Sequence, residues 1–265
     1  MPEFSRRDQQ QVVATGVPGL DELLYGGFAP RACVLVEGPP GAGKTTLGLQ
    51  FIYDGITKHN ERGIVITFEE LPEDIYRDAA SFGWDLPTLE QEGKLAVICT
   101  SPEVFEEDTL RLGGFFERTV LEVQPSRVLL DSITQTQQVS DDPVRQRRLV
   151  YGLRNCFKRH QLTAVLTREM NTDGPPDAAF ERYVADTVIT LDYRALPQAG
   201  LRVREIEVRK TRLRPHISGR HLLDITPHGM VVVPTLRPPT EGEELQAEPA
   251  LDFLPTGCSG LDMML

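Results

Sequence analysis

The chain has 265 residues, of which 40% are apolar and 25% charged, as expected for a globular protein with a sizeable core. With 28 Lys and Arg against 39 Asp and Glu, its formal charge is −11, which disfavours nucleic acid and anionic membranes as default partners. The start of the chain lacks the apolar segment of a leader, no apolar run approaches the roughly 18 residues of a membrane-spanning helix, and the four cysteines form no CxxC pair. We therefore expect a cytoplasmic protein with neither a zinc site nor a disulfide framework.

Short aliphatic runs alternate with longer amphipathic stretches along most of the chain. Residues 45–58 and 142–160 repeat apolar positions at helical spacing. The runs predict parallel strands at residues 32–36, 63–68, 95–98, 128–130 and 163–166, and further strands at 187–191 and 201–208. The last of these alternates apolar and charged residues like a half-exposed edge. The fold class is therefore α/β, with a mainly parallel sheet flanked by helices and an antiparallel extension at its C-terminal end.

The two ends of the chain differ in composition from the region between them. Residues 1–12 are polar and predicted to be flexible, and residues 13–233 form the predicted domain. Residues 234–253 are rich in Pro and Glu and predict a linker. Residues 256–265 then repeat the pattern T-G-x-x-G-L-D-x-x-L of residues 15–24, so we expect residues 254–265 to be the start of a second, truncated repeat.

Residues 38–45, Gly-Pro-Pro-Gly-Ala-Gly-Lys-Thr, satisfy the pattern G-x-x-x-x-G-K-[ST] between a predicted strand and a predicted helix. Glycines let successive backbone N–H groups turn toward a phosphate, and the helix start adds further donors. Lys44 is predicted to reach the β and γ phosphates and Thr45 to bind Mg²⁺. A ligand-free turn would need neither side chain. The predicted nucleotide contacts in this segment are Gly41, Ala42, Gly43, Lys44, Thr45 and Thr46.

Three acidic residues follow predicted strands. Asp131 ends the aliphatic run 127–130, a Walker B position that would hold Mg²⁺ with support from Ser132. Glu69 and Glu70 follow the strand 63–68 and could align a water for attack on the γ phosphate. From spacing alone a solvated glutamate pair is an equal alternative, and which glutamate serves water and which the metal stays open.

Lys210, Arg212 and Arg214 occupy alternate positions of an extended stretch and so share one side of it. They could stabilise γ-phosphate charge, in trans if they lie far from this chain's own phosphate loop. The alternative is a solvated edge that discourages strand pairing.

Together these segments resemble the KaiC family of RecA-type ATPases. The resemblance rests on residues 15–21, the phosphate loop, residues 67–70 and 81–86, Asp131-Ser132 and residues 210–216. It implies a RecA-like domain that forms a hexameric ring with ATP and Mg²⁺ at subunit boundaries, as the N-terminal half of a tandem protein. It implies that Glu69 and Glu70 activate water, with Glu70 joining Thr45 and Asp131 at the metal. Ser81 would approach the nucleotide, and the residues that contact ATP on the adjacent subunit would be Lys210, Arg212, His216 and Thr226.

The chain departs from the family where K-L-R-G-T-S-H is common, because it has Lys-Thr-Arg-Leu-Arg-Pro-His at residues 210–216. The phosphorylated residues of clock proteins belong to the second repeat, so autokinase activity would be a property of a longer protein. A KaiB-like partner would dock on the N-terminal ring, and we expect the acidic stretch 102–114 to be its surface. The leading hypothesis is an ATPase. The alternatives are a nucleotide-gated scaffold and a DNA-dependent RecA-like ATPase, which the acidic balance disfavours.

Overall fold

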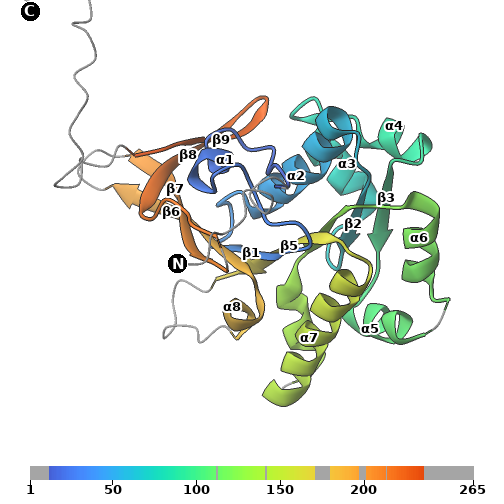
Figure 1. Cartoon of the computed structure of the whole chain (residues 1–265). Coiled ribbons are helices and arrows are strands. Elements are labelled where there is room, and N and C mark those ends of the chain that lie inside the picture. Colours follow the sequence, from blue (N-terminus) through green and yellow to red (C-terminus); the bar gives the residue numbers. More distant parts are fainter. Residues whose placement is uncertain are drawn as a thin grey trace, which may run out of the picture. The chain divides into compact units, whose positions relative to one another are not determined.

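The computed structural model describes residues 12–111, 113–140, 142–170, 180–196, 201–212 and 214–235, and within these ranges the strands form one sheet with helices on both faces (Figure 1). The strands are β1 (Cys33–Gly38), β2 (Gly63–Thr67), β3 (Leu95–Cys99), β4 (Arg127–Asp131), β5 (Thr163–Glu169), β6 (Thr187–Leu196), β7 (Leu201–Thr211), β8 (Arg220–Thr226) and β9 (Gly229–Val233).

The sheet has the order β3-β2-β4-β5-β1-β6-β7-β8-β9. The strands from β3 to β6 pair in parallel, and β6 to β9 pair antiparallel. The predicted mixed α/β sheet with an antiparallel extension is therefore confirmed. β1 lies between β5 and β6 and is buried along its whole length, as its aliphatic sequence predicts.

The helices are α1 (Leu20–Leu23), α2 (Lys44–His59), α3 (Pro72–Ala80), α4 (Leu86–Gln91), α5 (Pro102–Leu110), α6 (Phe115–Val123), α7 (Pro143–Arg159) and α8 (Glu181–Val184), with a 3₁₀ turn at Ile133–Gln138. Local sequence explains several of their ends. Ser101 and Asp142 accept hydrogen bonds from the first turns of α5 and α7, and each of these helices has proline at its first position. Asn60, the residue after α2, takes the left-handed conformation that commonly ends helices.

The core has two layers, one on each face of the sheet. Val34 and Val36 of β1 belong to the layer beneath α2, whereas Cys33 and Leu35 belong to the layer beneath α5, α6 and α7. This alternation is the period of two that a strand imposes. Figure 1 accordingly shows α2 and α7 on opposite sides of the sheet.

The helix α2 approaches the sheet closely because of Gly48. A Cβ atom at this position would lie 2.4 Å from Cδ1 of Leu129 in β4, so only glycine allows this separation. Gly48 lies one turn beyond the first residue of α2, and Leu129 lies two residues before the end of β4. The close approach therefore sets the spacing between the start of the helix and the end of the strand.

The flexible start predicted over residues 1–12 lies outside the described residues except for Val12. The predicted linker beyond residue 235 and the predicted second repeat lie outside them too, so these parts stay predictions. Among the described residues, no helix combines the length and the apolar character needed to cross a bilayer.

Candidate active site

The phosphate loop connects the buried strand β1 to the first turn of α2. Gly41 and Gly43 both have positive φ angles, 76° and 103°, which glycine adopts readily. Gly43 also lies against the β8–β9 hairpin, where an added Cβ would be 2.8 Å from Met230 Cε. The loop is thus held from behind by the antiparallel extension, with Ala42 fully buried.

The ammonium group of Lys44 is held over this loop. Its Nζ donates to the carbonyl oxygens of Gly38, at 3.1 Å, and Pro39, at 3.0 Å. Burial lowers the pKa of Lys44, while the negative charges of Glu169, Asp131 and Glu69 oppose this shift. A cation in this position suits the terminal phosphates of a nucleotide.

A pocket of about 300 Å³ opens above the loop at the carboxyl ends of the parallel strands. This is where ligands bind in open α/β sheets. The predicted site residues that line it are Gly41, Gly43, Lys44, Thr45, Thr46, Glu69, Glu70 and Asp131, together with Ser132.

Asp131, the last residue of β4, is half-buried in this pocket. It accepts a hydrogen bond from the hydroxyl of Thr167 on the neighbouring strand β5. Burial raises the pKa of Asp131 and the charge of Glu69 adds to the rise, whereas hydrogen bonds from Thr167 and Thr45 act against it. The Thr45 hydroxyl and the Asp131 carboxylate therefore lie together, as the sequence predicts for a metal site.

Glu69 and Glu70 enter the pocket from the turn after β2. The hydroxyl of Thr67 accepts hydrogen bonds from both of their amide groups, at 3.3 and 2.9 Å, and so shapes the turn. One carboxylate oxygen of Glu69 accepts from Ser132 Oγ at 3.4 Å and from the side-chain amide of Gln135. These contacts fix the position of Glu69. Ser132 was expected to support Asp131, but its hydroxyl donates to Glu69.

Glu70 experiences a different environment from its neighbour. Burial raises the pKa of Glu70, and the charges of Asp131, Asp78, Asp74 and Glu69 raise it further. A carboxylate with a raised pKa is a better proton acceptor near neutral pH, as a general base requires.

Glu169 is a pocket residue that sequence reasoning missed. It ends β5, its amide donates to Thr134 Oγ1 at 2.8 Å, and its charge has the largest effect on Lys44 among the neighbouring carboxylates. The signal was available, because Glu169 ends a strand in the same way as Asp131.

The donor set of the pocket fits Mg²⁺. It offers the Thr45 hydroxyl and the Asp131, Glu69 and Glu70 carboxylates, all oxygen ligands. Proteins commonly hold Mg²⁺ through one or two side chains together with phosphate and water.

Six predicted residues do not line this pocket: the buried Ala42 of the loop, and Ser81, Lys210, Arg212, His216 and Thr226. Ser81 follows α3 and donates to Asp78 O at 2.6 Å, and Thr226, at the end of β8, donates to Gly229 O at 2.8 Å. The ring of His216 lies 3.0 Å from Thr211 Oγ1.

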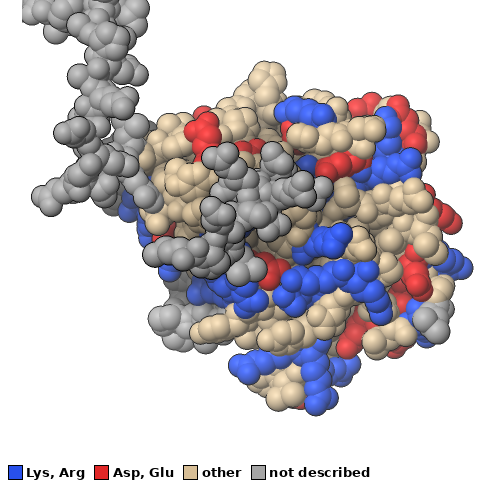
Figure 2. Space-filling view, viewed as in Figure 1, with Lys and Arg blue, Asp and Glu red and all other residues tan. Residues whose placement is uncertain are grey.

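Lys210 and Arg212 lie near the amino-terminal end of β1, at the opposite end of the strand from the pocket. Arg212 follows β7, and its amide donates to the carbonyl oxygen of Asp186. The amide of Asp186 in turn donates to the carbonyl oxygen of Cys33, at the start of β1. Arg212 is therefore level with Cys33, about 16 Å along the strand from Gly38 at the usual rise per residue. Figure 2 shows Lys and Arg side chains gathered across one face of the molecule close to α7 and β1.

Comparisons with known proteins agree with this architecture. A family model described as a KaiC ATPase matches residues 13–237. The circadian clock oscillator protein KaiC of Parathermosynechococcus lividus is 36% identical over 228 residues, which are 83% of this chain and 42% of the relative. That of Synechococcus elongatus is 34% identical over 247 residues, 88% of this chain and 47% of the relative.

Solved structures give the same result. The crystal structure of a KaiC-like protein from the archaeon Pyrococcus horikoshii superposes with a TM-score of 0.75 and 32% sequence identity. The match covers 84% of this chain and 99% of the archaeal one. The chain spans less than half the length of the curated relatives it matches.

Proposed function

The chain belongs to the KaiC family of ATPases, and on that premise we propose that it hydrolyses ATP slowly with Mg²⁺, in a hexameric ring with nucleotides between subunits. The RecA-like fold and the phosphate loop make it a P-loop ATPase. We further propose that the ring acts in the cytoplasm in clock-like or signalling regulation.

Within one subunit, the pocket would supply the groups for phosphoryl transfer to water. Lys44 and the loop amides would hold the β and γ phosphates. Thr45, Asp131 and Glu70 would hold Mg²⁺, which neutralises charge on the phosphate oxygens when bound. Glu69 and Glu70 would orient a water and accept its proton as its oxygen attacks the γ phosphorus.

The observation that supports the ring is the separation of the phosphate loop from the Lys210 and Arg212 side chains within one subunit. Arg212 lies about 16 Å along the strand from the phosphate loop, and the side chains of both Lys210 and Arg212 are bonded to α8. If these cations stabilise γ-phosphate charge, they do so on the nucleotide of another subunit. His216, Thr226 and Ser81 are proposed to complete the contacts to ATP.

Native mass spectrometry with and without ATP and Mg²⁺ tests this proposal. We expect a hexamer only with nucleotide, and replacement of both Glu69 and Glu70 by Gln should keep the ring while abolishing turnover. A monomer under both conditions would contradict the shared site.

The surface of α5 favours a second candidate function, a nucleotide-gated scaffold. Val104 and Leu110 of α5 are 60% and 80% exposed beside the acidic residues Glu103, Glu106 and Glu107. Exposed apolar side chains with a charged rim are typical of docking surfaces. We propose that a KaiB-like protein binds there. If the doubly substituted glutamate variant still binds this partner, hydrolysis is incidental to recruitment.

A further inference from the structure

The short helix α8 holds both of the proposed trans-acting cations. Lys210 Nζ donates to the carbonyl oxygens of Arg182 and Ala185, each at 2.8 Å. Arg212 donates to the carbonyl oxygen of Tyr183 at 2.7 Å. The last carbonyls of a helix have no partner within it, and cationic side chains satisfy them well. The positions of Lys210 and Arg212 therefore depend on the position of α8.

The strand β1 in turn holds α8 at two points. At its start, the amide of Cys33 donates to Asp186 Oδ2 at 3.0 Å, and Asp186 follows α8 by two residues. Near its end, the two carboxylate oxygens of Glu37 share the single Nε–H of Arg182, at 2.8 and 2.9 Å. Glu37 directly precedes Gly38, the first residue of the phosphate loop.

Asp186 strengthens the first of these two contacts. It pairs with Lys158 at 3.0 Å and Arg154 at 3.3 Å, both on α7, and with Arg212 at 3.6 Å. Burial opposes the ionisation of Asp186, but the Cys33 amide, Lys158 and Arg154 outweigh it and lower its pKa. Asp186 is thus a charged anchor between β1, α7 and Arg212.

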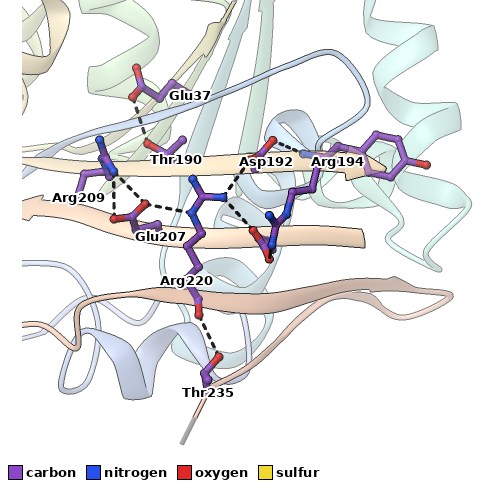
Figure 3. A network of polar contacts seen from close by, with 10 residues as sticks. Glu37, Thr190, Asp192, Arg194, Glu207, Arg209, Arg220 and Thr235 are labelled. Atoms are coloured by element: carbon purple, nitrogen blue, oxygen red, sulfur yellow. Dashed lines mark hydrogen bonds and ion pairs between the residues drawn. The ribbon is translucent and has the colours of Figure 1, made fainter. Parts of the chain in front are cut away.

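Glu37 is the centre of the second contact. Its side chain is 1% exposed, and it also accepts from Thr190 on β6 at 3.2 Å (Figure 3). It meets Arg168 on β5 at 3.4 Å. A carboxylate so deeply buried needs its partners, because an uncompensated charge in the interior is costly. The contact between Glu37 and Arg182 is therefore expected to persist when the surrounding chain moves.

We propose that Glu37 and Arg182 are positioning residues, which couple the phosphate loop of one subunit to the Lys210 and Arg212 side chains that the same subunit presents to its neighbour. The proposal rests on the proposed function, in which those cations act in trans. Strand β1 is then shared by two active sites: its end carries one site's phosphate loop, and the helix anchored on it places the cations of the next site.

Arg182→Ala is the first variant to test. The Arg182 side chain is 36% exposed, so its truncation leaves no large cavity in the core. Glu37→Gln is the second, because it keeps the shape of Glu37 and removes its charge. We expect either change to lower kcat about tenfold while the Kd for a fluorescent ATP analogue changes less than twofold, since only transition-state contacts are lost.

Mixed rings separate positioning in trans from damage to the subunit's own site. Subunits in which Glu69 and Glu70 are both replaced by Gln keep the ring but do not turn over ATP, and they present normal cations. In an equal mixture with Arg182→Ala, about one quarter of sites combine intact glutamates with normal cations, so we expect about one quarter of the wild-type rate. If Arg182 instead supports its own loop, half of the sites run at one tenth of the wild-type rate, and the mixture gives about one twentieth.

Arg212→Ala mixed with the doubly substituted glutamate variant is the reference for the proposed function. If this pair is not rescued, the cations do not act in trans and the proposed function fails. If it is rescued and the Arg182→Ala pair is not, the trans site stands and the positioning role of Arg182 is wrong. Arg194→Ala is the control variant. It removes a half-exposed arginine of β6 that pairs with Glu205 of β7 (Figure 3), and it should leave kcat unchanged.

Hydrogen exchange supplies a readout that does not depend on turnover. The Arg182→Ala and Glu37→Gln variants should exchange the amides of residues 181–186 at least tenfold faster than the unmodified chain, while those of β4 and β5 stay unchanged. Unchanged exchange in residues 181–186 would show that Glu37 and Arg182 do not hold α8.

Discussion

Gly48→Ala tests whether the close approach of α2 to β4 sets up the metal site. The new Cβ would lie 2.4 Å from Leu129 Cδ1 and 2.9 Å from Cδ2. Carbon atoms in contact need about 3.5 Å, so helix and strand must separate by about 1 Å unless Leu129 rotates. Leu129 is fully buried, which leaves it little room to do so.

The magnitude follows from two opposing effects. Overpacking costs about 1–3 kcal/mol, and replacing glycine by alanine inside a helix returns about 1 kcal/mol. The net loss of stability is therefore about 0–2 kcal/mol, which lowers the Tm by up to about 8 °C in a domain of this size. The loss of activity should be larger, because moving Thr45 by about 1 Å relative to Asp131 can reduce kcat by about 10².

Gly152→Ala is the matched control. Gly152 also lies inside a long helix, α7, but an added Cβ there meets no atom within 4 Å. This change should raise stability by about 0.5–1 kcal/mol without changing the rate. Thermal unfolding and steady-state ATP turnover of both variants decide the matter. A Gly48→Ala protein as stable and as active as Gly152→Ala would refute the reasoning.

Three further predictions concern the charges in the pocket. Because burial raises the pKa of Asp131, its ionisation at neutral pH destabilises the folded state. Asp131→Asn should therefore raise the Tm by about 2–4 °C without nucleotide and remove the stabilisation by ATP and Mg²⁺. Thermal shift with and without ligand measures both effects, and a lower Tm without nucleotide would contradict the prediction. Burial raises the pKa of both Glu70 and Asp131, so kcat/KM should fall on the acid side at a pH above about 4.3, the ordinary pKa of a glutamate. A fall centred at or below that pH would contradict the role of burial. The charge of Glu169 raises the pKa of Lys44 against the effect of burial, so Glu169→Gln should lower that pKa. ATP binding should then be lost at a lower pH on the alkaline side than in the unmodified chain. Equal profiles of Kd between pH 7 and 10 would disprove the coupling.

The parts of the site that follow from local patterns were predictable from the sequence. The phosphate loop is a fixed spacing of glycines, a lysine and a threonine, and the structure places Lys44 and Thr45 where that spacing implies. Asp131 follows because a carboxylate after an aliphatic run lies at the carboxyl edge of a parallel sheet. Glu169 was missed because the strand was predicted to end at residue 166, three residues too early.

Features with few apolar residues were harder to predict. The helix α3 buries only Ile75 and Ala79, too few to show helical periodicity. The hairpin of β8 and β9 was not predicted either, although β8 alternates buried and exposed residues before a tight turn at Gly229. The resemblance identified Lys210 and Arg212, but no spacing rule could reveal that α8 and β1 hold them, because these contacts join residues that are distant in the sequence.

The place of β1 in the sheet has a consequence for synthesis of the protein. Its neighbours are β5, which pairs Cys33 with Ala164, and β6, which pairs Val34 with Thr187. Neither neighbour exists when β1 leaves the ribosome, and the roughly 150 residues that must follow take about 8–30 s to translate. During that interval β1, which is buried along its whole length in the folded domain, has no sheet to join, which is the situation in which chaperones protect nascent chains. The phosphate loop therefore forms late, after the strands β5 and β6 have been made.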